Sequence, residues 1–78
     1  MPTAFVLVNS EIGAEDKVLE AVKQISVVRD AYVVYGVYDI ILRVAAPSMG
    51  ELKEIIATHI RTLENVHSTM TMVVMEAD

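Results

Sequence analysis

The stretch Tyr35-Gly36-Val37-Tyr38-Asp39 lies at the midpoint of the chain and decides how the rest is arranged. It separates residues 27–34 from residues 40–45, two stretches rich in β-branched and apolar side chains. A glycine between such stretches is typical of a tight β-hairpin, because glycine adopts the positive φ that the turn requires. We therefore expect two antiparallel strands joined at Gly36, the second starting at Tyr38. The Asp39 carboxylate then either accepts hydrogen bonds from turn amides or meets a cation.

Further elements are predicted on either side of this hairpin. Residues 3–9 form a strand, and apolar residues at helical spacing from Ala14 predict an amphipathic helix of about three turns. After the hairpin, Pro47 ends the third strand near Ala46 because proline lacks the amide that the ladder needs. Ser48 and Glu51 then form a capping-box pattern that starts a second helix. The expected apolar stripes of the two helices are Ala14, Val18, Ala21, Val22 and Ile25, and Leu52, Ile55, Ile56 and Ile60.

With residues 66–75 as the last strand, the element order is β-α-β-β-α-β. Two helices with one apolar stripe each cover only one face of a four-stranded antiparallel sheet. The sequence thus predicts an α+β ferredoxin-like sandwich in which a single domain spans residues 1–78.

Composition excludes several classes of function. The chain has a formal net charge of −5, and its Lys and Arg residues are scattered, so we expect no direct contact with nucleic acid. It contains no cysteine, which is compatible with the cytoplasm, and its two histidines lack metal-ligand spacing. No signal-peptide pattern is present, and no apolar run approaches the ~18 residues of a membrane span. We expect no membrane association, no metal and no cofactor.

The predicted sheet is apolar on both faces, although the helices cover only one of them. Alternating positions divide its apolar residues into two opposite sets. The first set is Val6, Val8, Val33, Tyr35, Val37 and Ile41, and the second is Phe5, Leu7, Tyr32, Val34, Ile40 and Leu42. A small domain with 54% hydrophobic residues must leave some of them outside its core, where they commonly form an interface. We expect a dimer in which the uncovered faces of two sheets meet, burying ~800 Å² per subunit, with Arg43 pairing across it.

Three segments carry a resemblance to a known family. The helix segment 18–22, the Gly-x-x-Asp turn of Gly36 to Asp39, and Thr69-Met70-Thr71 in the last strand are similar to those of the ligand-sensing (RAM) domain of the Lrp/AsnC transcriptional regulators. The resemblance covers essentially the whole chain. It implies a sheet-to-sheet dimer that assembles into rings, often octamers, and small effectors, commonly amino acids, bound between neighbouring dimers. Full-length members carry a helix-turn-helix. No such pattern occurs in these residues, so the chain resembles the stand-alone sensing modules that modulate regulators by co-assembly.

The resemblance also implies roles for the residues of the turn. Asp39 would pair the ammonium of an amino acid, and the amides of Gly36, Val37 and Tyr38 would take its carboxylate. Tyr35 and Tyr38 would wall the side-chain pocket.

Thr69 and Thr71 would offer hydroxyls to the same cleft, with His67 on their side of the strand. Each residue also has a structural alternative. Asp39 would be satisfied by turn amides, the tyrosines would pack in the core or an interface, and the threonines would be ordinary β-branched strand residues.

Two other function classes remain open. Small monooxygenases and isomerases of the dimeric α+β barrel group share this architecture. Their candidate residues here, Asp39, His59 and His67, do not fall at a spacing typical of a nucleophile and its base, and we expect no enzyme. An ACT-like regulatory domain has the same element order, and Gly13 lies near the glycine that such domains carry after the first strand.

Overall fold

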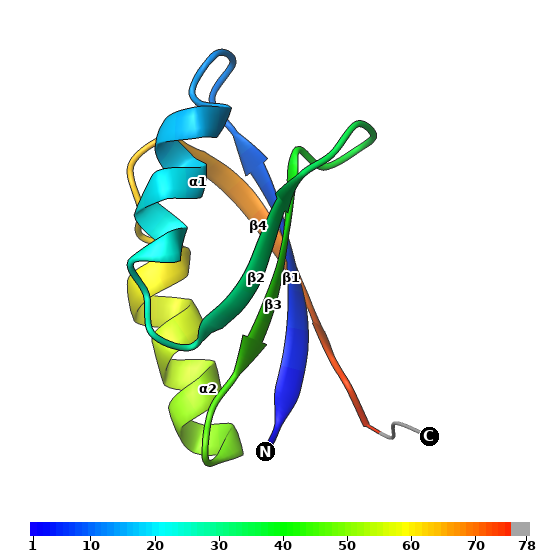
Figure 1. Cartoon of the computed structure of the whole chain (residues 1–78), viewed down its shortest axis with the longest axis vertical. Helices are drawn as coiled ribbons and strands as arrows, with labels where there is room; N and C mark the ends of the chain where they lie inside the picture. The colour runs from blue at the N-terminus through cyan, green and yellow to red at the C-terminus, as the bar shows by residue number, and fades with distance from the viewer. Residues whose placement is uncertain (76–78) are drawn as a thin grey trace.

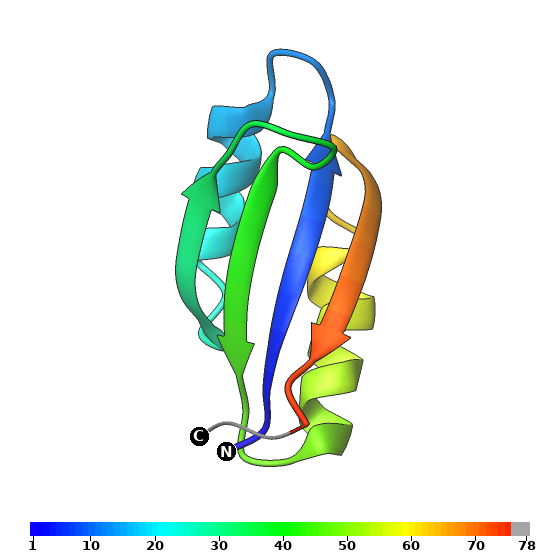
Figure 2. The ribbon, with the colours of Figure 1, turned by 90° about the vertical axis from the view of Figure 1, so that its right-hand side faces the viewer.

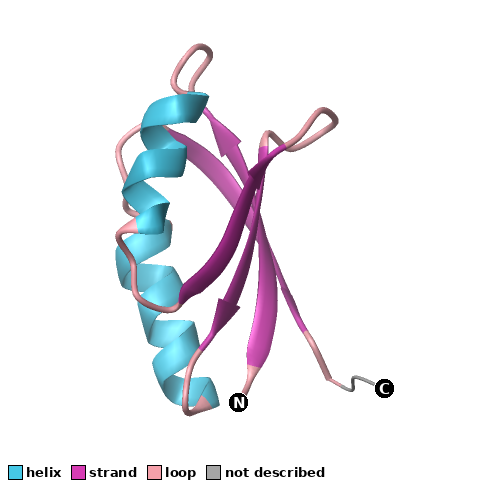
Figure 3. Cartoon of the chain, viewed as in Figure 1, coloured by secondary structure: helices cyan, strands magenta, loops and turns pink. Residues whose placement is uncertain are grey.

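The computed structural model describes residues 1–75 as two layers, a sheet and a pair of helices that both lie on one side of it (Figures 1 and 3). The elements follow the predicted order, which confirms the α+β sandwich. They are β1 (Thr3–Ser10), α1 (Glu15–Lys23), β2 (Val28–Val33), β3 (Ile40–Ala45), α2 (Met49–Ile55), its π-helical continuation η1 (Ile56–Ile60), and β4 (Val66–Val73). The four strands are antiparallel and lie in the order β2-β3-β1-β4 (Figure 2).

Both helices begin where the local chemistry predicts. Glu15 and Asp16 occupy the first turn of α1, where the helix dipole favours negative charge. The Ser48 hydroxyl accepts a hydrogen bond of 3.2 Å from the Glu51 amide, which confirms Ser48 as the N-cap of α2. At the other end, the Arg61 amide donates to the Ile56 carbonyl, the spacing of a π-helix. None of the helices described in residues 1–75 has the length and apolarity needed to cross a membrane.

The core lies between the helices and one face of the sheet. The register pairs Val6 with Leu42 and Val8 with Ile40, so these four side chains share the helix-facing side. The helices close this layer with fully or almost fully buried residues, namely Val18, Val22, Leu52, Ile56 and Ile60. The expected grouping of alternate positions is therefore wrong, because Val6 and Val8 lie with Ile40 and Leu42 rather than with Ile41.

The other side of the sheet, which we call the open face, is apolar too. Its side chains Phe5, Leu7, Tyr32, Ile41, Met70 and Met72 follow from the register of the strands. Phe5 is 37% exposed, Met70 and Met72 are each 48% exposed, and Tyr32 is 58% exposed. The prediction of an apolar uncovered face is thus confirmed for the described residues, with these side chains as its members.

The connection between β2 and β3 differs from the expected tight hairpin. β2 ends at Val33 and β3 begins only at Ile40, so residues 34–39 form an extended loop. The Val34 amide closes this loop by donating to the Asp39 carbonyl at 2.8 Å. Gly36 has a φ of +148°, which side chains rarely tolerate, so the loop needs glycine there. The sequence locates the glycine correctly but underestimates the loop, because the Asp39 amide pairs with β1 rather than with β2.

Candidate functional site

The loop of residues 34–39 is attached to the end of β1 through Asp39. The Asp39 amide donates to the Val8 carbonyl at 2.9 Å, and Asp39 Oδ2 accepts from the Ser10 amide at 3.0 Å. The structural alternative for Asp39 was a carboxylate that accepts hydrogen bonds from amides of the turn. The carboxylate does accept from a backbone amide, but this amide belongs to β1 rather than to the turn. Within residues 1–75 this is the hydrogen bond that the carboxylate accepts, and Oδ1 accepts none.

Two hollows flank this loop and share Val34 and Tyr35. The first, of about 350 Å³, lies between the loop and the N-terminus of α1, and we call it the acidic hollow. Its lining residues are Glu15, Asp16, Val33, Val34, Tyr35 and Asp39. Three of these carry carboxylates and none is basic, so a cationic group would be attracted to it. Sequence reasoning did not include Glu15 and Asp16 among the site residues. The order of the elements could have indicated that they belong to the site, because a β-α-β unit brings the start of α1 and the β2–β3 loop to the same end of the sheet (Figure 1).

The second hollow, of about 230 Å³, opens on the open face and is mainly apolar; we call it the apolar hollow. Its lining residues are Leu7, Val34, Tyr35, Gly36, Val37, Tyr38 and Ile41. The Tyr35 and Val37 side chains project from the loop and are almost fully exposed. The sequence-predicted residues 35–39 are thus brought together around one loop, with a charged side at Asp39 and an apolar side at Tyr38.

Thr69 and Thr71 lie elsewhere in the same chain. They pair with Val8 and Val6 across the β1–β4 ladder, on the opposite side of β1 from Asp39. Thr69 lines a separate hollow of about 290 Å³ whose other residues are Arg61, Val66, His67 and Ser68. One chain therefore does not place the two threonines in a hollow with Asp39, and their predicted role requires a neighbouring subunit.

Several polar groups near the site have partners that sequence reasoning missed. His67 Nε2 lies 2.5 Å from Glu11 Oε2, which joins β4 to the β1–α1 connection. Arg43 pairs with Asp30 of the same chain, Nε to Oδ2 at 2.5 Å. The expected pairing of Arg43 across the dimer stays a prediction. The Asp30 partner was missed because a bulge between Val28 and Asp30 shifts the β2–β3 register by one residue.

The buried hydroxyl of Ser10, next to Asp39, has no hydrogen-bond partner within the described residues. Such a group calls for an explanation, and Ser10 lines neither of the two hollows at the loop.

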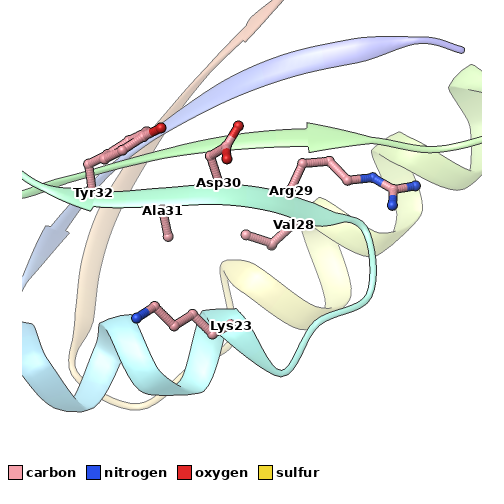
Figure 4. Close-up of a pocket in the computed structure, with 6 residues that line it drawn as sticks. All are labelled: Lys23, Val28, Arg29, Asp30, Ala31 and Tyr32. Carbon is pink, nitrogen blue, oxygen red and sulfur yellow. The ribbon is translucent and has the colours of Figure 1, made fainter.

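A further hollow, of about 300 Å³, runs along the edge strand β2 and is lined by Lys23 and residues 28–32. Val28 and Ala31 point toward α1 in this region, whereas Asp30 and Tyr32 point away from it, toward the open face (Figure 4). This hollow lies apart from the predicted ligand site.

Among residues 1–75, no group of three or more His, Asp or Glu side chains is arranged to hold a metal ion.

Residues 3–77 match the family model described as the Lrp/AsnC ligand binding domain. An uncharacterised HTH-type transcriptional regulator of Pyrococcus furiosus is 32% identical over 74 residues. That alignment covers 91% of this chain but 49% of the relative, so the chain spans about half the length of this curated relative.

Solved structures agree with this match. The crystal structure of FFRP-DM1 is 36% identical, with a TM-score of 0.93 over 96% of this chain and 100% of that one. A protein of Thermus thermophilus is 31% identical, with a TM-score of 0.94 over 100% of this chain and 98% of that one.

Two more distant structures share the fold. Escherichia coli AsnC is 22% identical with a TM-score of 0.91, and this chain covers 52% of it. A feast or famine regulatory protein of Mycobacterium tuberculosis, solved in complex with L-methionine, is 24% identical with a TM-score of 0.81, and this chain again covers 52% of it. With a family model matched over nearly all of its residues, the chain belongs to the Lrp/AsnC family, where it corresponds to the ligand-binding domain.

Proposed function

We propose that this chain binds a free amino acid at the loop of residues 34–39, assembles through the open face of its sheet, and thereby modulates transcriptional regulators of its own family. The observation that carries the proposal is the match of residues 3–77 to a ligand-binding domain. Asp39 in the acidic hollow, with the apolar hollow on the other side of the same loop, supports it, because an amino acid has both a cationic and an apolar end.

The chemistry of the loop suits the ammonium and carboxylate of such a ligand. Asp39 Oδ1 would accept a charge-assisted hydrogen bond from the ammonium, in a hollow whose other charged residues are also acidic. Among the described residues, the amides of Gly36, Val37 and Tyr38 donate no hydrogen bond within the chain. These amides are therefore free to bind a carboxylate.

The side chain of the ligand would enter the apolar hollow beside Tyr38. L-Methionine is the first candidate, because the Mycobacterium tuberculosis relative was crystallised with it.

The proposed site is completed by assembly. Thr69 and Thr71 lie on the far side of β1 from Asp39, so they would reach a ligand only from a neighbouring subunit. A dimer that buries the open face, extended to a ring such as an octamer, would bring different edges of several chains together. A ligand that bridges subunits shifts the assembly equilibrium because it binds the assembled state more tightly than the free chain.

Calorimetric titration with the standard amino acids, beginning with L-methionine, tests the ligand. We expect saturable heat from at least one of them, and a loss of affinity of at least about tenfold in Asp39→Asn, because a hydrogen bond to a charged group is weakened. The asparagine oxygen can still accept from the Ser10 amide, so the fold should persist. Glu64→Gln, at an exposed carboxylate outside the loop, makes the same change of charge and should bind normally.

No saturable heat from any amino acid, or equal affinity in Asp39→Asn, would contradict the proposed site. Light scattering of the same samples, with and without ligand, measures the assembly. A mass that stays at one subunit at high protein concentration would rule out the proposed mode of action.

We propose no catalytic role. Of the three candidates for the enzyme alternative, Asp39 lines the acidic hollow, but neither histidine lines either hollow at the loop to act as its partner. His67 is paired with Glu11, and His59 Nδ1 lies 2.8 Å from the Thr58 hydroxyl on the helix layer.

A further inference from the structure

The open face contains one ion pair among its apolar side chains. Asp30 on β2 is the register partner of Arg43 on β3, and Arg43 in turn is opposite Phe5 on β1. The next row of this face consists of Tyr32, Ile41 and Leu7. The side chains of Arg43 and Asp30 are 43% and 37% exposed in the single chain. A partner that covered the apolar residues of this face would therefore cover the ion pair as well.

The charge of this face differs from that of the whole molecule. The chain carries a formal net charge of −5, which opposes the approach of a second copy. At the paired positions of the open face, the charged residues are Asp30 and Arg43, and their charges cancel. Arg29, at the bulge, rises from the same side of β2 as Asp30 and extends toward the end of the strand (Figure 4). The excess negative charge therefore lies on other surfaces, and the two charges among the apolar rows of the open face cancel, with Arg29 beside them at the end of β2.

We infer that the Asp30–Arg43 pair is the neutralising unit that allows the apolar rows of the open face to be buried against a second copy of this chain. This inference rests on the assembly proposed above and assigns a role to two residues outside the ligand site. Removing one member of a buried ion pair leaves an uncompensated charge, which is strongly unfavourable, whereas replacing both members is often neutral. The pair thus determines whether the face associates, although it contributes little apolar area itself.

A double-mutant cycle on self-association tests this inference. We expect Asp30→Asn and Arg43→Gln each to raise the dimer dissociation constant by at least about tenfold. The double variant D30N/R43Q should return to within about threefold of the wild type, because it again buries no net charge. Arg43→Lys keeps the charge and should also associate normally. Sedimentation equilibrium across a concentration series measures each constant, with circular dichroism to verify the fold.

Matched controls and outcomes keep this test separate from the proposed function. Glu54→Gln and Lys53→Gln make the same changes of charge on the exposed side of α2 and should leave association unchanged. If the wild type does not associate and Phe5→Glu has no effect, the proposed assembly fails and the inference fails with it. If the wild type associates and Phe5→Glu abolishes this, only the role of the pair is in question. Single variants that associate like the wild type, or a double variant no stronger than the singles, would then overturn it.

Discussion

The two faces of the sheet are both apolar, yet they differ in the residues that make them so. The helix-facing side is built of aliphatic residues that are completely buried, such as Val6, Ile40 and Leu42. The open face instead contains aromatic and methionine side chains that remain partly exposed, with an ion pair among them. Aromatic residues and methionine are enriched in interfaces, while rigid aliphatic residues fill cores. The helix-facing side therefore stabilises the fold of one chain, and the open face is suited to association.

Adjacent isoleucines of β3 provide the largest test of this difference. Ile40 is fully buried under the helices, and Ile41 lies half-buried on the open face. We expect Ile40→Ala to lower the free energy of unfolding by about 2–5 kcal/mol, because it leaves a cavity in a packed core. Ile41→Ala should cost less than about 1 kcal/mol in dilute, unassociated protein, since solvent fills the space. Urea unfolding at low protein concentration measures both, and equal losses would show that the faces do not differ.

A charge placed on the open face should break association without breaking the fold. Met70→Glu puts a lone carboxylate among the apolar side chains of this face, and burying it would weaken the dimer by at least about 100-fold. Ala57→Glu, exposed on the helix layer, introduces the same side chain where no partner is expected. Light scattering compares the masses, and circular dichroism compares the folds. A dimer that persists in Met70→Glu but dissociates in Ala57→Glu would move the interface to the helices.

The smallest expected change in the free energy of unfolding comes from the helix layer alone. Ser48→Ala removes the hydroxyl that accepts from the Glu51 amide, and should lower the free energy of unfolding by about 1 kcal/mol. Because Ser48 caps α2, and the helices lie on the other side of the sheet from the open face (Figure 3), association of the folded protein should not change. Thermal unfolding and sedimentation give the two quantities. A change in dimer affinity with unchanged stability would contradict this separation.

Local sequence features predicted much of the fold because they act over a few residues. The spacing of Val18 and Val22 indicates α1, the Ser48 cap marks the start of α2, and the glycine at position 36 marks the reversal between β2 and β3. The predicted boundaries differ from the observed ones by only a few residues, as with β3, which begins at Ile40 rather than Tyr38. Element ends are decided by hydrogen bonds to other strands, which local spacing does not report.

The candidate site was predicted less completely, because its parts meet through contacts between distant segments. The sequence indicated Tyr35 to Asp39 as one group, and the structure places them around one loop. It did not indicate that Glu15 would line a hollow with Asp39, or that Thr69 would lie across β1 from it. Both facts depend on strand order and on where α1 begins, which no single stretch of residues contains.

The sequence by itself determined that this protein has two amphipathic helices, a glycine-dependent loop, and more apolar surface than one small core can bury. Those properties follow from composition and periodicity, which each segment carries alone. The tertiary structure decided which apolar residues are the core and which are the open face. It also decided that Arg43 pairs with Asp30 and that Asp39 is attached to Ser10. The reason is register: a shift of one residue moves a side chain to the opposite face of a sheet, and long-range hydrogen bonds set that register.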